Sequence, residues 1–302
     1  MKVLITGGLG FVGTQLSIRL LGKGHHVTIV DHAPSPRAYT PLEVRYLSAD
    51  TTVRGAWQEE VSDHDAVINL AGASIFRRWN DETKQLIYDS RVLTTRNVVE
   101  AMPEGKNALL CSTSAVGYYG SRGEELLTEH DAPGDDFLAN VCIDWENEAQ
   151  KAADKGVRVV LTRFGIVLGK TGGALGQMIP AFKKFVGGPL GSGNQWFSWI
   201  HMEDLVNAFI FVFEKEEVSG PVNFCAPNPV RNRDLADTLG EILRRPSLLK
   251  TPAFMLRIML GEFGSILLEG QRVVPAKLLE HGFSFRYPEI TDALEEVVGN
   301  NS

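Results

Sequence analysis

Residues 3–13, VLITGGLGFVG, constrain the fold more than any other stretch of the chain. A short aliphatic and β-branched segment leads into Gly7, Gly10 and Gly13, and an apolar helical pattern follows over residues 14–21. This order predicts a strand, a tight turn and a helix, with the glycines allowing the turn, the close approach of a pyrophosphate and the packing of helix on strand. Free N–H groups and the helix dipole favour an anionic phosphate there. A turn that needs glycine for its geometry alone is the alternative.

The second predicted strand, residues 26–30, bears on the choice of nucleotide. It ends at Asp31, about where an acidic residue reaches an adenosine ribose. A carboxylate there favours NAD, because NADP would carry its 2′-phosphate at the same place. His32 and Arg37 follow, and an arginine that folds back would favour NADP instead. The sequence thus predicts a nicotinamide dinucleotide and leaves NAD or NADP open.

The first 165 residues alternate apolar strands with helical patterns, which is typical of parallel β-α-β units. We expect strands at residues 2–6, 26–30, 44–48, 66–69, 108–112 and 158–163, and helices at residues 13–23, 55–61, 81–100 and 138–155. The predicted fold is α/β, a Rossmann-type doubly wound parallel sheet with its ligand at the carboxyl ends of the strands.

Glycine-rich stretches at residues 165–176 and 187–193 mark a change in composition. They enclose a helical pattern and read as loops around a site or as a lid. We expect residues 1–165 to form the dinucleotide-binding domain, with later segments returning to it. Residues 166–302 then mainly form a smaller mixed α/β substrate-binding domain and a C-terminal module.

Composition excludes several classes of function. The 302 residues have a formal net charge of -7 and no long basic run, so no nucleic-acid partner is expected. Cys111, Cys142 and Cys225 match neither a disulfide framework nor a zinc spacing, and we expect reduced thiols and no metal. No apolar run is long enough to span a membrane and no leader is recognisable, so we expect no membrane partner and a cytoplasmic protein. A small-molecule substrate and a homodimer fit this composition.

The chain resembles an extended short-chain dehydrogenase/reductase of the nucleoside-diphosphate-sugar epimerase type, nearly from end to end. The motifs that carry the resemblance are the turn at residues 6–13, the Asp50 turn, NLAG at residues 69–72, STS at residues 112–114 and HMED at residues 201–204. More narrowly, it resembles an atypical epimerase-like branch with a C-terminal module of unknown function. The marks of that branch are YYG at residues 118–120, DDFL at residues 135–138, WE at residues 145–146 and GFSFRYP at residues 282–288.

The resemblance implies a set of cofactor-binding residues. Gly7, Gly10 and Gly13 would hold the pyrophosphate, Asp31 would face the ribose, and Asp50 would lie beside adenine. Ala71 would line the nicotinamide side. The complete expected set is Gly7, Gly10, Phe11, Val12, Gly13, Asp31, Asp50, Leu70, Ala71 and Gly72.

The chain departs from the wider family at the catalytic helix. The family uses a tyrosine, with a lysine four residues later whose charge lowers the pKa of the tyrosine. Counting back from the Trp145-Glu146 pair places Leu138 and Cys142 in those two positions. A leucine cannot titrate, and a thiol cannot replace a cationic donor to ribose.

Ser114 and Tyr118 are the expected catalytic residues. Ser114 would follow a strand, where the family hydrogen-bonds a substrate oxygen, although a serine that caps the turn is the alternative. Tyr118 and Tyr119 are the tyrosines near enough to replace the missing acid, and we prefer Tyr118 and expect one of the two to pack. Arg163 ends a predicted strand and either shapes the substrate side or forms a salt bridge.

Other polar and aromatic residues have structural readings that we prefer. Asp135 and Asp136 precede a helix, which favours N-capping over general-base catalysis. A dyad of His201 with Asp204 is disfavoured, because the resemblance makes this box a structural element. Two basic pairs beside the predicted cleft loops, Arg77 with Arg78 and Lys183 with Lys184, are expected to be solvated, with binding of an anion as the alternative. An aromatic cluster is expected to lie in the core, with binding of a ring as the alternative; its members are Trp196, Phe197 and Trp199.

The sequence therefore favours an NAD(P)-dependent oxidoreductase or epimerase acting at a hydroxyl or carbonyl carbon, with a sugar nucleotide as the substrate that the resemblance implies. The rival is a dinucleotide-binding or redox-sensing protein that has lost the tyrosine and lysine chemistry. Whether the chain is an enzyme stays open at this point.

Overall fold

A parallel sheet of seven strands forms the centre of the molecule in a computed structural model that describes residues 1–105, 108–170 and 172–299. The strand order is β11-β7-β5-β4-β1-β2-β3, and every neighbouring pair is parallel. The strands are β1 (Lys2–Thr6), β2 (His26–Asp31), β3 (Arg45–Ser48), β4 (Ala66–Asn69), β5 (Leu109–Ala115), β7 (Arg158–Phe164) and β11 (Gly220–Phe224). This order confirms the predicted Rossmann-type doubly wound sheet.

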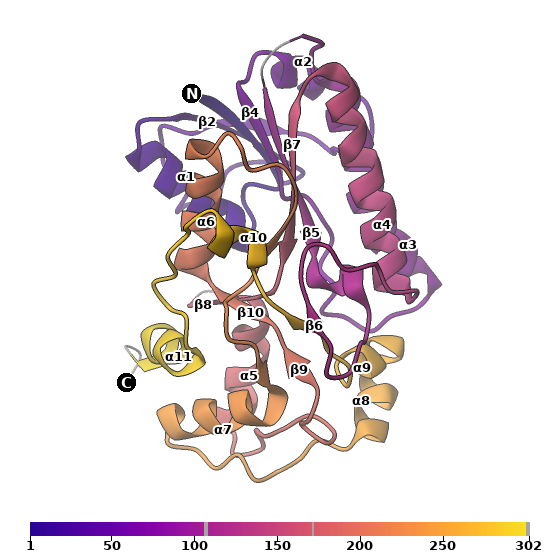
Figure 1. Cartoon of the computed structure of the whole chain (residues 1–302), viewed down its shortest axis with the longest axis vertical. Helices are drawn as coiled ribbons and strands as arrows, with labels where there is room; N and C mark the ends of the chain where they lie inside the picture. The colour runs from indigo at the N-terminus through magenta and orange to yellow at the C-terminus, as the bar shows by residue number, and fades with distance from the viewer. Residues whose placement is uncertain (106–107, 171, 300–302) are drawn as a thin grey trace.

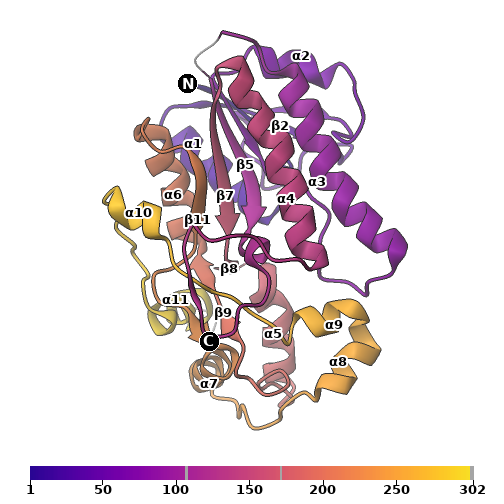
Figure 2. The same ribbon diagram turned by 45° about the vertical axis from the view of Figure 1, so that its right-hand side comes forward.

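Helices cover both faces of the sheet, which explains why its strands are almost continuously apolar. Helices α1 (Phe11–Gly22) and α6 (Met202–Glu214) lie side by side on one face, where they pack on Val3 and Ile5. On the other face lie α2 (Trp57–Ser62), α3 (Asp81–Ala101) and α4 (Phe137–Gln150), packed on Leu4 and Val67 (Figure 2).

Most of the predicted boundaries lie within a few residues of the observed ones. Side chains cap two helices as local rules require: Asn80 accepts a hydrogen bond from the N–H of Thr83, and Asp136 accepts one from the N–H of Ala139. The main difference is β5, which continues to Ala115. Ser114 therefore lies inside this strand and does not follow it as expected. The helix predicted to reach residue 155 also ends earlier, and a 3-10 turn, η2 (Lys151–Lys155), continues it.

A smaller mixed α/β half lies beyond the carboxyl ends of the strands (Figure 1). Its core packs the fully buried Trp199, Leu235 and Leu294 between helices and short strands. Its elements are β8 (Ile166–Gly169), α5 (Gly173–Lys183), β9 (Trp196–Phe197), β10 (Trp199–His201), β12 (Val230–Arg231), α7 (Asn232–Leu243), α8 (Ala253–Leu260), α9 (Glu262–Ile266), β13 (Arg272–Val273) and α11 (Ile290–Val298). Helix α10 (Ala276–Glu280) instead packs on β11 in the sheet half.

The two halves exchange segments. Strand β11 and helix α6 come late in the chain but join the sheet layers. In the other direction, β6 (Leu126–Leu127) leaves the first half and pairs with β13. No helix in the described ranges is long and apolar enough to cross a membrane.

Candidate cofactor and active site

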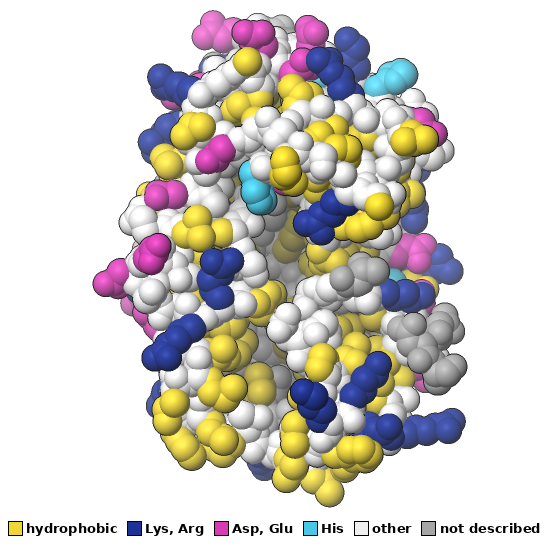
Figure 3. All heavy atoms as spheres, turned by 180° about the vertical axis from the view of Figure 1, so that it is seen from behind, with side chains coloured by type: hydrophobic (Ala, Val, Ile, Leu, Met, Phe, Trp, Pro, Cys, Tyr) yellow, Lys and Arg dark blue, Asp and Glu magenta, His cyan; other side chains and the backbone are white. Residues whose placement is uncertain are grey.

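A hollow runs along the long axis down the middle of the face shown in Figure 3, over the sheet half and the smaller half. Hydrophobic side chains are visible inside it, and Lys or Arg side chains stand at its margin. The strand arrows in Figure 2 point toward the smaller half, so the carboxyl edge of the sheet faces that half. Open α/β sheets bind ligands at this edge.

The glycine turn shows why each of its glycines is needed. Gly7 has a φ of +66°, and a Cβ on it would lie 2.8 Å from Cα of Ala71. A Cβ on Gly13 would lie 2.6 Å from Cα of Gly8, so the helix packs against the turn itself. Gly10 is different because it is exposed, and a Cβ on it would approach only the Gly7 carbonyl oxygen, at 3.1 Å. The space above Gly10 is therefore open to a ligand.

Helix α1 begins directly after this open glycine. Gly10 occupies the N-cap and offers no side-chain acceptor, so the first N–H groups, those of Phe11, Val12 and Gly13, lack a side-chain cap. Uncapped N–H groups at a helix start suit a phosphate. The turn thus fits the predicted pyrophosphate.

Asp31 is buried beside the glycine turn. Its Oδ2 accepts a hydrogen bond from the N–H of Leu9 at 3.2 Å, and its Oδ1 accepts one from the N–H of Ala33 at 3.3 Å. The exposed His32 places Nδ1 3.2 Å from Oδ1. The carboxylate is therefore fixed at the end of β2, where the sequence expects the ribose.

The other predicted cofactor residues lie in loops at the same edge. The N–H of Leu70 donates to the carbonyl oxygen of Thr6 and so anchors the loop after β4 beside the glycine turn. A Cβ on Gly72 would lie 3.2 Å from Cζ of Arg91, whose guanidinium donates to the Ala73 carbonyl. The Asp50 Oδ1 accepts from both the N–H and the hydroxyl of Thr52, which closes a turn after β3.

Phe11 joins the glycine turn to the glycine-rich stretch after β8. Cβ atoms on Gly169, Gly172 and Gly173 would each lie about 3 Å from its ring, at 2.9, 3.0 and 2.9 Å. Larger residues there would collide with the ring. The predicted lid and the predicted cofactor turn therefore contact each other directly.

A buried polar network lies between β5, β7 and α4. The Arg163 guanidinium donates to both carboxylate oxygens of Glu146, from Nε to Oε1 and from Nη2 to Oε2, each at 2.8 Å. The Ser114 hydroxyl donates to Oε1 of Glu146 at 2.6 Å. Arg163 also donates to the hydroxyl of Tyr119 at 2.9 Å, and that hydroxyl donates to Oδ1 of Asn223 at 2.7 Å.

Burial and the neighbouring charges have opposite effects on the pKa values of Arg163 and Tyr119 in this network. Burial disfavours the cation of Arg163, but the hydrogen bonds and the charge of Glu146 outweigh burial and raise the pKa of the guanidinium. Burial raises the pKa of the Tyr119 phenol, and the nearby Arg163 offsets this only in part. Arg163 is thus a fixed cation, and Tyr119 is a packed neutral phenol, as expected for one of the two tyrosines.

Tyr118 differs from its neighbour in exposure. It lies on the short turn η1 (Val116–Tyr119) and is only half-buried. The Arg163 Cζ lies 3.5 Å from the centroid of its ring, and the ring meets that of Tyr119 edge-on at 5.3 Å. Its hydroxyl forms no hydrogen bond with a residue in the described ranges. The geometry therefore offers a phenol that is held at its ring and free at its oxygen.

Ser114 is placed differently from the expectation. It is 1% exposed, and its proton is engaged by Glu146. The role predicted for it, a direct hydrogen bond to substrate, remains a prediction. Next to it, the Thr113 Oγ1 is buried without a hydrogen-bond partner among the described residues.

The two departures from the family pattern lie on α4 opposite this turn. A Cβ on Gly117 would lie 3.6 Å from Cβ of Leu138, so this leucine faces η1. The Cys142 Sγ lies 3.9 Å from the Ala115 carbonyl oxygen, and burial raises the pKa of its thiol to about 11. Leu138 cannot titrate, and the Cys142 thiol stays neutral near neutral pH, so neither side chain supplies the cation that the family's lysine provides.

The remaining candidates have the structural roles that the sequence favours. Asp136 caps α4, and Phe197 and Trp199 are buried in the core of the smaller half. His201 pairs with Glu296 at 3.1 Å, while the Asp204 carboxylate accepts the N–H groups of two residues of the C-terminal module, Arg286 and Tyr287. The exposed candidates are Asp135, Arg77, Arg78, Lys183 and Lys184, and Trp196 is half-buried. The cysteines are buried free thiols; they are Cys111, Cys142 and Cys225.

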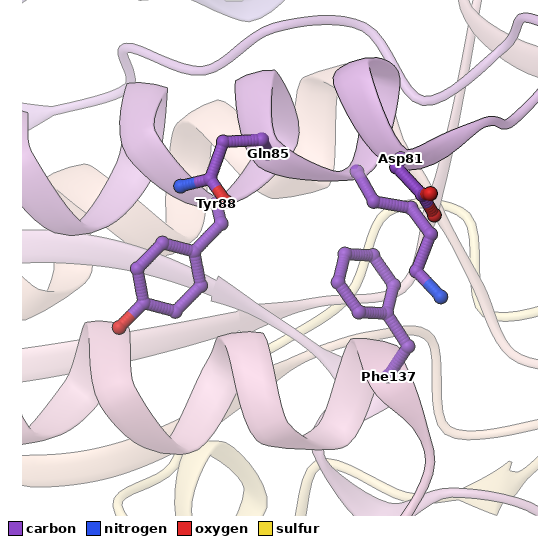
Figure 4. Close-up of a pocket in the computed structure, with 5 residues that line it drawn as sticks. Asp81, Gln85, Tyr88 and Phe137 are labelled. Atoms are coloured by element: carbon purple, nitrogen blue, oxygen red, sulfur yellow. The ribbon is translucent and has the colours of Figure 1, made fainter.

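A shallow pocket elsewhere on the surface lies between α3 and α4 (Figure 4). Tyr88 and Phe137 extend into it, and Asp81 and Gln85 stand on the α3 side. The Tyr88 hydroxyl donates to Asp144 on α4 at 3.0 Å. None of the predicted site residues lines this pocket, and it carries no part of the argument below.

Sequence reasoning missed Glu146 and Asn223 as members of the buried polar network, and it missed Glu129, whose Oε1 accepts the N–H of Asn223 at 2.9 Å. It used Glu146 only to recognise the helix. One signal was available, because Glu146 lies four residues after Cys142 and so shares the apolar face of α4. An acid on a buried helix face requires a partner, and a cation near a strand end such as Arg163 is a candidate.

A model of the NAD dependent epimerase/dehydratase family matches residues 3–225, and a domain of unknown function, DUF1731, matches residues 251–297. The chain belongs to the NAD-dependent epimerase/dehydratase family. It is 41% identical over 302 residues to an Arabidopsis thaliana protein named epimerase family protein SDR39U1 homolog, chloroplastic, with 99% of this chain and 87% of that protein covered. It is 39% identical to the Bacillus subtilis epimerase family protein YfhF over 99% of both chains.

Solved structures agree with this family. The crystal structure of human epimerase family protein SDR39U1 (isoform 2) with NADPH has a TM-score of 0.88 and 33% identity, with both chains fully covered. A UDP-glucuronic acid 4-epimerase from Bacillus cereus has a TM-score of 0.81 over 98% of both chains, but its 19% identity supports the fold alone. Family membership confirms the resemblance drawn from the motifs and the prediction of NAD or NADP as cofactor.

Proposed function

We propose that the protein is an NAD(P)-dependent oxidoreductase or epimerase that acts at a hydroxyl or carbonyl carbon of a small molecule. One observation carries this proposal. Tyr118 has a free phenol hydroxyl, and its ring lies on the Arg163 guanidinium, which Glu146 holds in place. Tyr118 and the open glycine turn lie at the same edge of the sheet, where the strands end.

The residues around the turn fit a dinucleotide. Its pyrophosphate would lie over Gly10 and the uncapped start of α1, with Gly7 and Gly13 allowing the approach. Asp31 would face the adenosine ribose. The other proposed contacts are Phe11 and Val12 at the turn, Asp50 at the adenine end, and Leu70, Ala71 and Gly72 at the nicotinamide end.

The side chains handle the proton. A bound nicotinamide supplies or accepts the hydride at the reacting carbon. Tyr118 donates its proton to the substrate oxygen during reduction of a carbonyl. Arg163 holds the ring in position, and Glu146 holds Arg163. Ser114 donates its own proton to Glu146, so its hydroxyl oxygen can only accept; we propose that it accepts a hydrogen bond from the hydroxyl of the alcohol form of the substrate.

A sugar nucleotide is the first substrate class to test. A Corynebacterium glutamicum protein whose structure is titled nucleoside-diphosphate sugar epimerase is 33% identical to this chain, which spans 58% of that protein. More distant neighbours include UDP-sugar epimerases. The cytoplasmic location and the homodimer expected from the sequence stay predictions.

A dinucleotide-binding protein without catalysis is the second candidate. Leu138 and Cys142, in place of the family's tyrosine and lysine, favour it. The two candidates predict the same cofactor binding and differ in the effect of Tyr118.

The deciding experiment follows oxidation of the reduced dinucleotide with a panel of carbonyl compounds and sugar nucleotides. Tyr118→Phe should lower kcat by about 10²- to 10⁴-fold, the usual contribution of a general acid, with dinucleotide affinity unchanged. Ser114→Ala should also lower kcat. Tyr119→Phe is the matched control, because it removes a buried hydroxyl and should reduce stability more than turnover. If Tyr118→Phe and Ser114→Ala both keep full activity with cofactor bound, the assignment is wrong and the binding-protein candidate is favoured.

A further inference from the structure

Large apolar side chains are exposed on two neighbouring segments of the smaller half. They are Phe185 and Val186 after α5, Leu248 and Leu249 before α8, and Phe254, Met255, Ile258 and Met259 on α8. The exposed fraction is 84% for Leu248, 67% for Ile258 and 65% for Met259. Scattered exposed apolar residues are normal, but a contiguous group marks an interaction surface.

Backbone contacts make these two segments one surface. The N–H of Thr251 donates to the Pro189 carbonyl oxygen, and the N–H of Gly191 donates to the Thr251 carbonyl oxygen, both at 2.9 Å. The Arg245 Cζ lies 4.6 Å from the ring centroid of Phe185. We call residues 183–186 and 244–259 the basic apolar patch. Figure 3 shows hydrophobic and basic side chains together on both sides of the lower part of the hollow.

The charge of the basic apolar patch is opposite to that of the whole chain. The protein has a formal net charge of -7, yet residues 176–202 and 242–261 contain no Asp or Glu. These stretches carry six cations, which are Lys183, Lys184, Arg244, Arg245, Lys250 and Arg257. The flanking carboxylates are Glu203, which is paired with Arg286, Glu241, and Glu262, which is paired with Lys84. On the neighbouring α7, the Asp237 carboxylate accepts the hydroxyl proton of Ser247. Exposed apolar side chains surrounded by cations are typical of helices that lie at the surface of anionic membranes.

We propose that the basic apolar patch docks on the surface of an anionic lipid membrane. The exposed side chains of α8 would enter the boundary between headgroups and acyl chains, and the six cations would face the lipid phosphates. The sequence predicted no membrane partner because no apolar run is long enough to span a bilayer, but surface docking does not need one. The proposal goes beyond the proposed function and does not depend on it.

Charge and shape favour a membrane over the other occupants. A second copy would place the same six cations against themselves across a two-fold axis, and like charges would repel. A partner helix requires a groove. Here Phe254, Ile258 and Met259 protrude from α8 with more than half of their surface exposed, so they suit a soft interface.

The test is co-sedimentation of the full chain with vesicles of phosphatidylcholine, with and without phosphatidylglycerol. We expect binding to the anionic vesicles, weak binding to the neutral ones, and loss of binding as salt rises, because salt screens the cations. Ile258→Asp with Met259→Asp should weaken binding by about tenfold or more, since it removes inserted apolar surface. Lys183→Glu with Lys184→Glu should weaken it similarly.

Matched controls separate this surface from a general effect. Leu42→Asp changes an apolar side chain that is 100% exposed and outside the patch, and Lys215→Glu reverses an exposed cation elsewhere. Both should bind vesicles like the unmodified chain, and all variants should keep the same thermal unfolding temperature. Absence of binding to anionic vesicles, or equal loss in patch and control variants, would overturn the proposal. A dimer that forms without vesicles in sedimentation, and that the double variant Ile258→Asp with Met259→Asp abolishes, would also overturn the proposal. The patch would then bind a second copy of the chain.

Discussion

Single residues decide what the glycine turn can bind. Gly7 and Gly13 are required by the fold, because a Cβ at either position would collide with backbone. Gly10 is not, since only one carbonyl oxygen lies near the position of its Cβ. A substitution at Gly10 therefore tests the ligand, whereas substitutions at the other two glycines would test folding.

We expect Gly10→Val to weaken binding of NAD and NADP by about a hundredfold or more, roughly 3 kcal/mol, because the side chain would occupy the space above the helix start. Titration calorimetry measures the affinity. Gly22→Val is the matched control on the same helix, since a Cβ at Gly22 meets nothing within 4 Å. Unchanged affinity in Gly10→Val would exclude the glycine turn as the cofactor site.

Asp31 should set the preference between the two nucleotides. Asp31→Ser removes a negative charge from the expected position of the 2′-phosphate, so the ratio of NADP affinity to NAD affinity should rise by about tenfold, or 1.4 kcal/mol. The ratio is the right measure, because the substitution also loosens the turn by removing the acceptor for the N–H of Leu9, and this affects both nucleotides. Asp50→Asn is the control that should leave the ratio unchanged. An unchanged ratio in Asp31→Ser would mean that Asp31 does not face the ribose.

At the scale of elements, the sequence predicted six of the seven strands of the sheet, all but β11, and predicted the site less well. Strands and helices follow local rules, such as the Asp136 cap and the apolar runs of a sheet covered on both faces. The end of β5 does not follow such a rule, because residues 113–115 stay in the strand through pairing with residues 162–164 of β7. That pairing places Ser114 beside Arg163 and inside the strand.

The Glu146–Arg163 pair was missed for a related reason. Sequence reasoning identified Arg163 as a candidate but could not supply its partner, because the two residues meet only when α4 packs on β5 and β7. Short strands such as β9 and β13, each of two residues, also depend on distant partners. Local sequence patterns therefore could not predict the features that depend on contacts between distant segments.

Removing only one partner of the Glu146–Arg163 pair should lower the free energy of unfolding strongly. Glu146→Leu leaves the Arg163 cation buried and unpaired, and it should lower the free energy of unfolding by about 3–5 kcal/mol. Adding Arg163→Met should restore much of this loss, because the buried charge is then gone as well. Urea denaturation measures both variants.

The control for this prediction is a surface pair. Lys23→Ala breaks the exposed pair of Lys23 with Glu214 and should change the free energy of unfolding by less than about 1 kcal/mol. If Glu146→Leu costs no more than Lys23→Ala, the buried network does not hold Arg163 in place.

At the scale of the whole molecule, Glu129 joins the C-terminal module to the sheet. Its Oε1 accepts the N–H of Asn223 on β11 at 2.9 Å and the N–H of Lys277 on α10 at 3.3 Å. Asn223 in turn donates to the Val274 carbonyl oxygen and accepts the hydroxyl proton of Tyr119. The C-terminal module is thus connected through Asn223 to the Tyr119 and Arg163 side of the proposed site.

The buried carboxyl of Glu129 should give this connection a pH dependence. Burial raises the pKa of Glu129 above its ordinary value of 4.5, although the N–H groups of Asn223 and Lys277 oppose the shift. The folded chain therefore holds this proton more tightly than the unfolded chain, so its stabilising effect is present below pH 4.5 and is lost as pH rises through the raised pKa.

Glu129→Gln keeps an oxygen for both N–H groups and has no charge to bury. We expect the free energy of unfolding of this variant, relative to the unmodified chain, to increase from pH 4.5 upward and then level off. Denaturation across this pH range measures the difference, with the exposed Glu43→Gln as control. A difference that does not change with pH would show that Glu129 is not desolvated between the C-terminal module and the sheet.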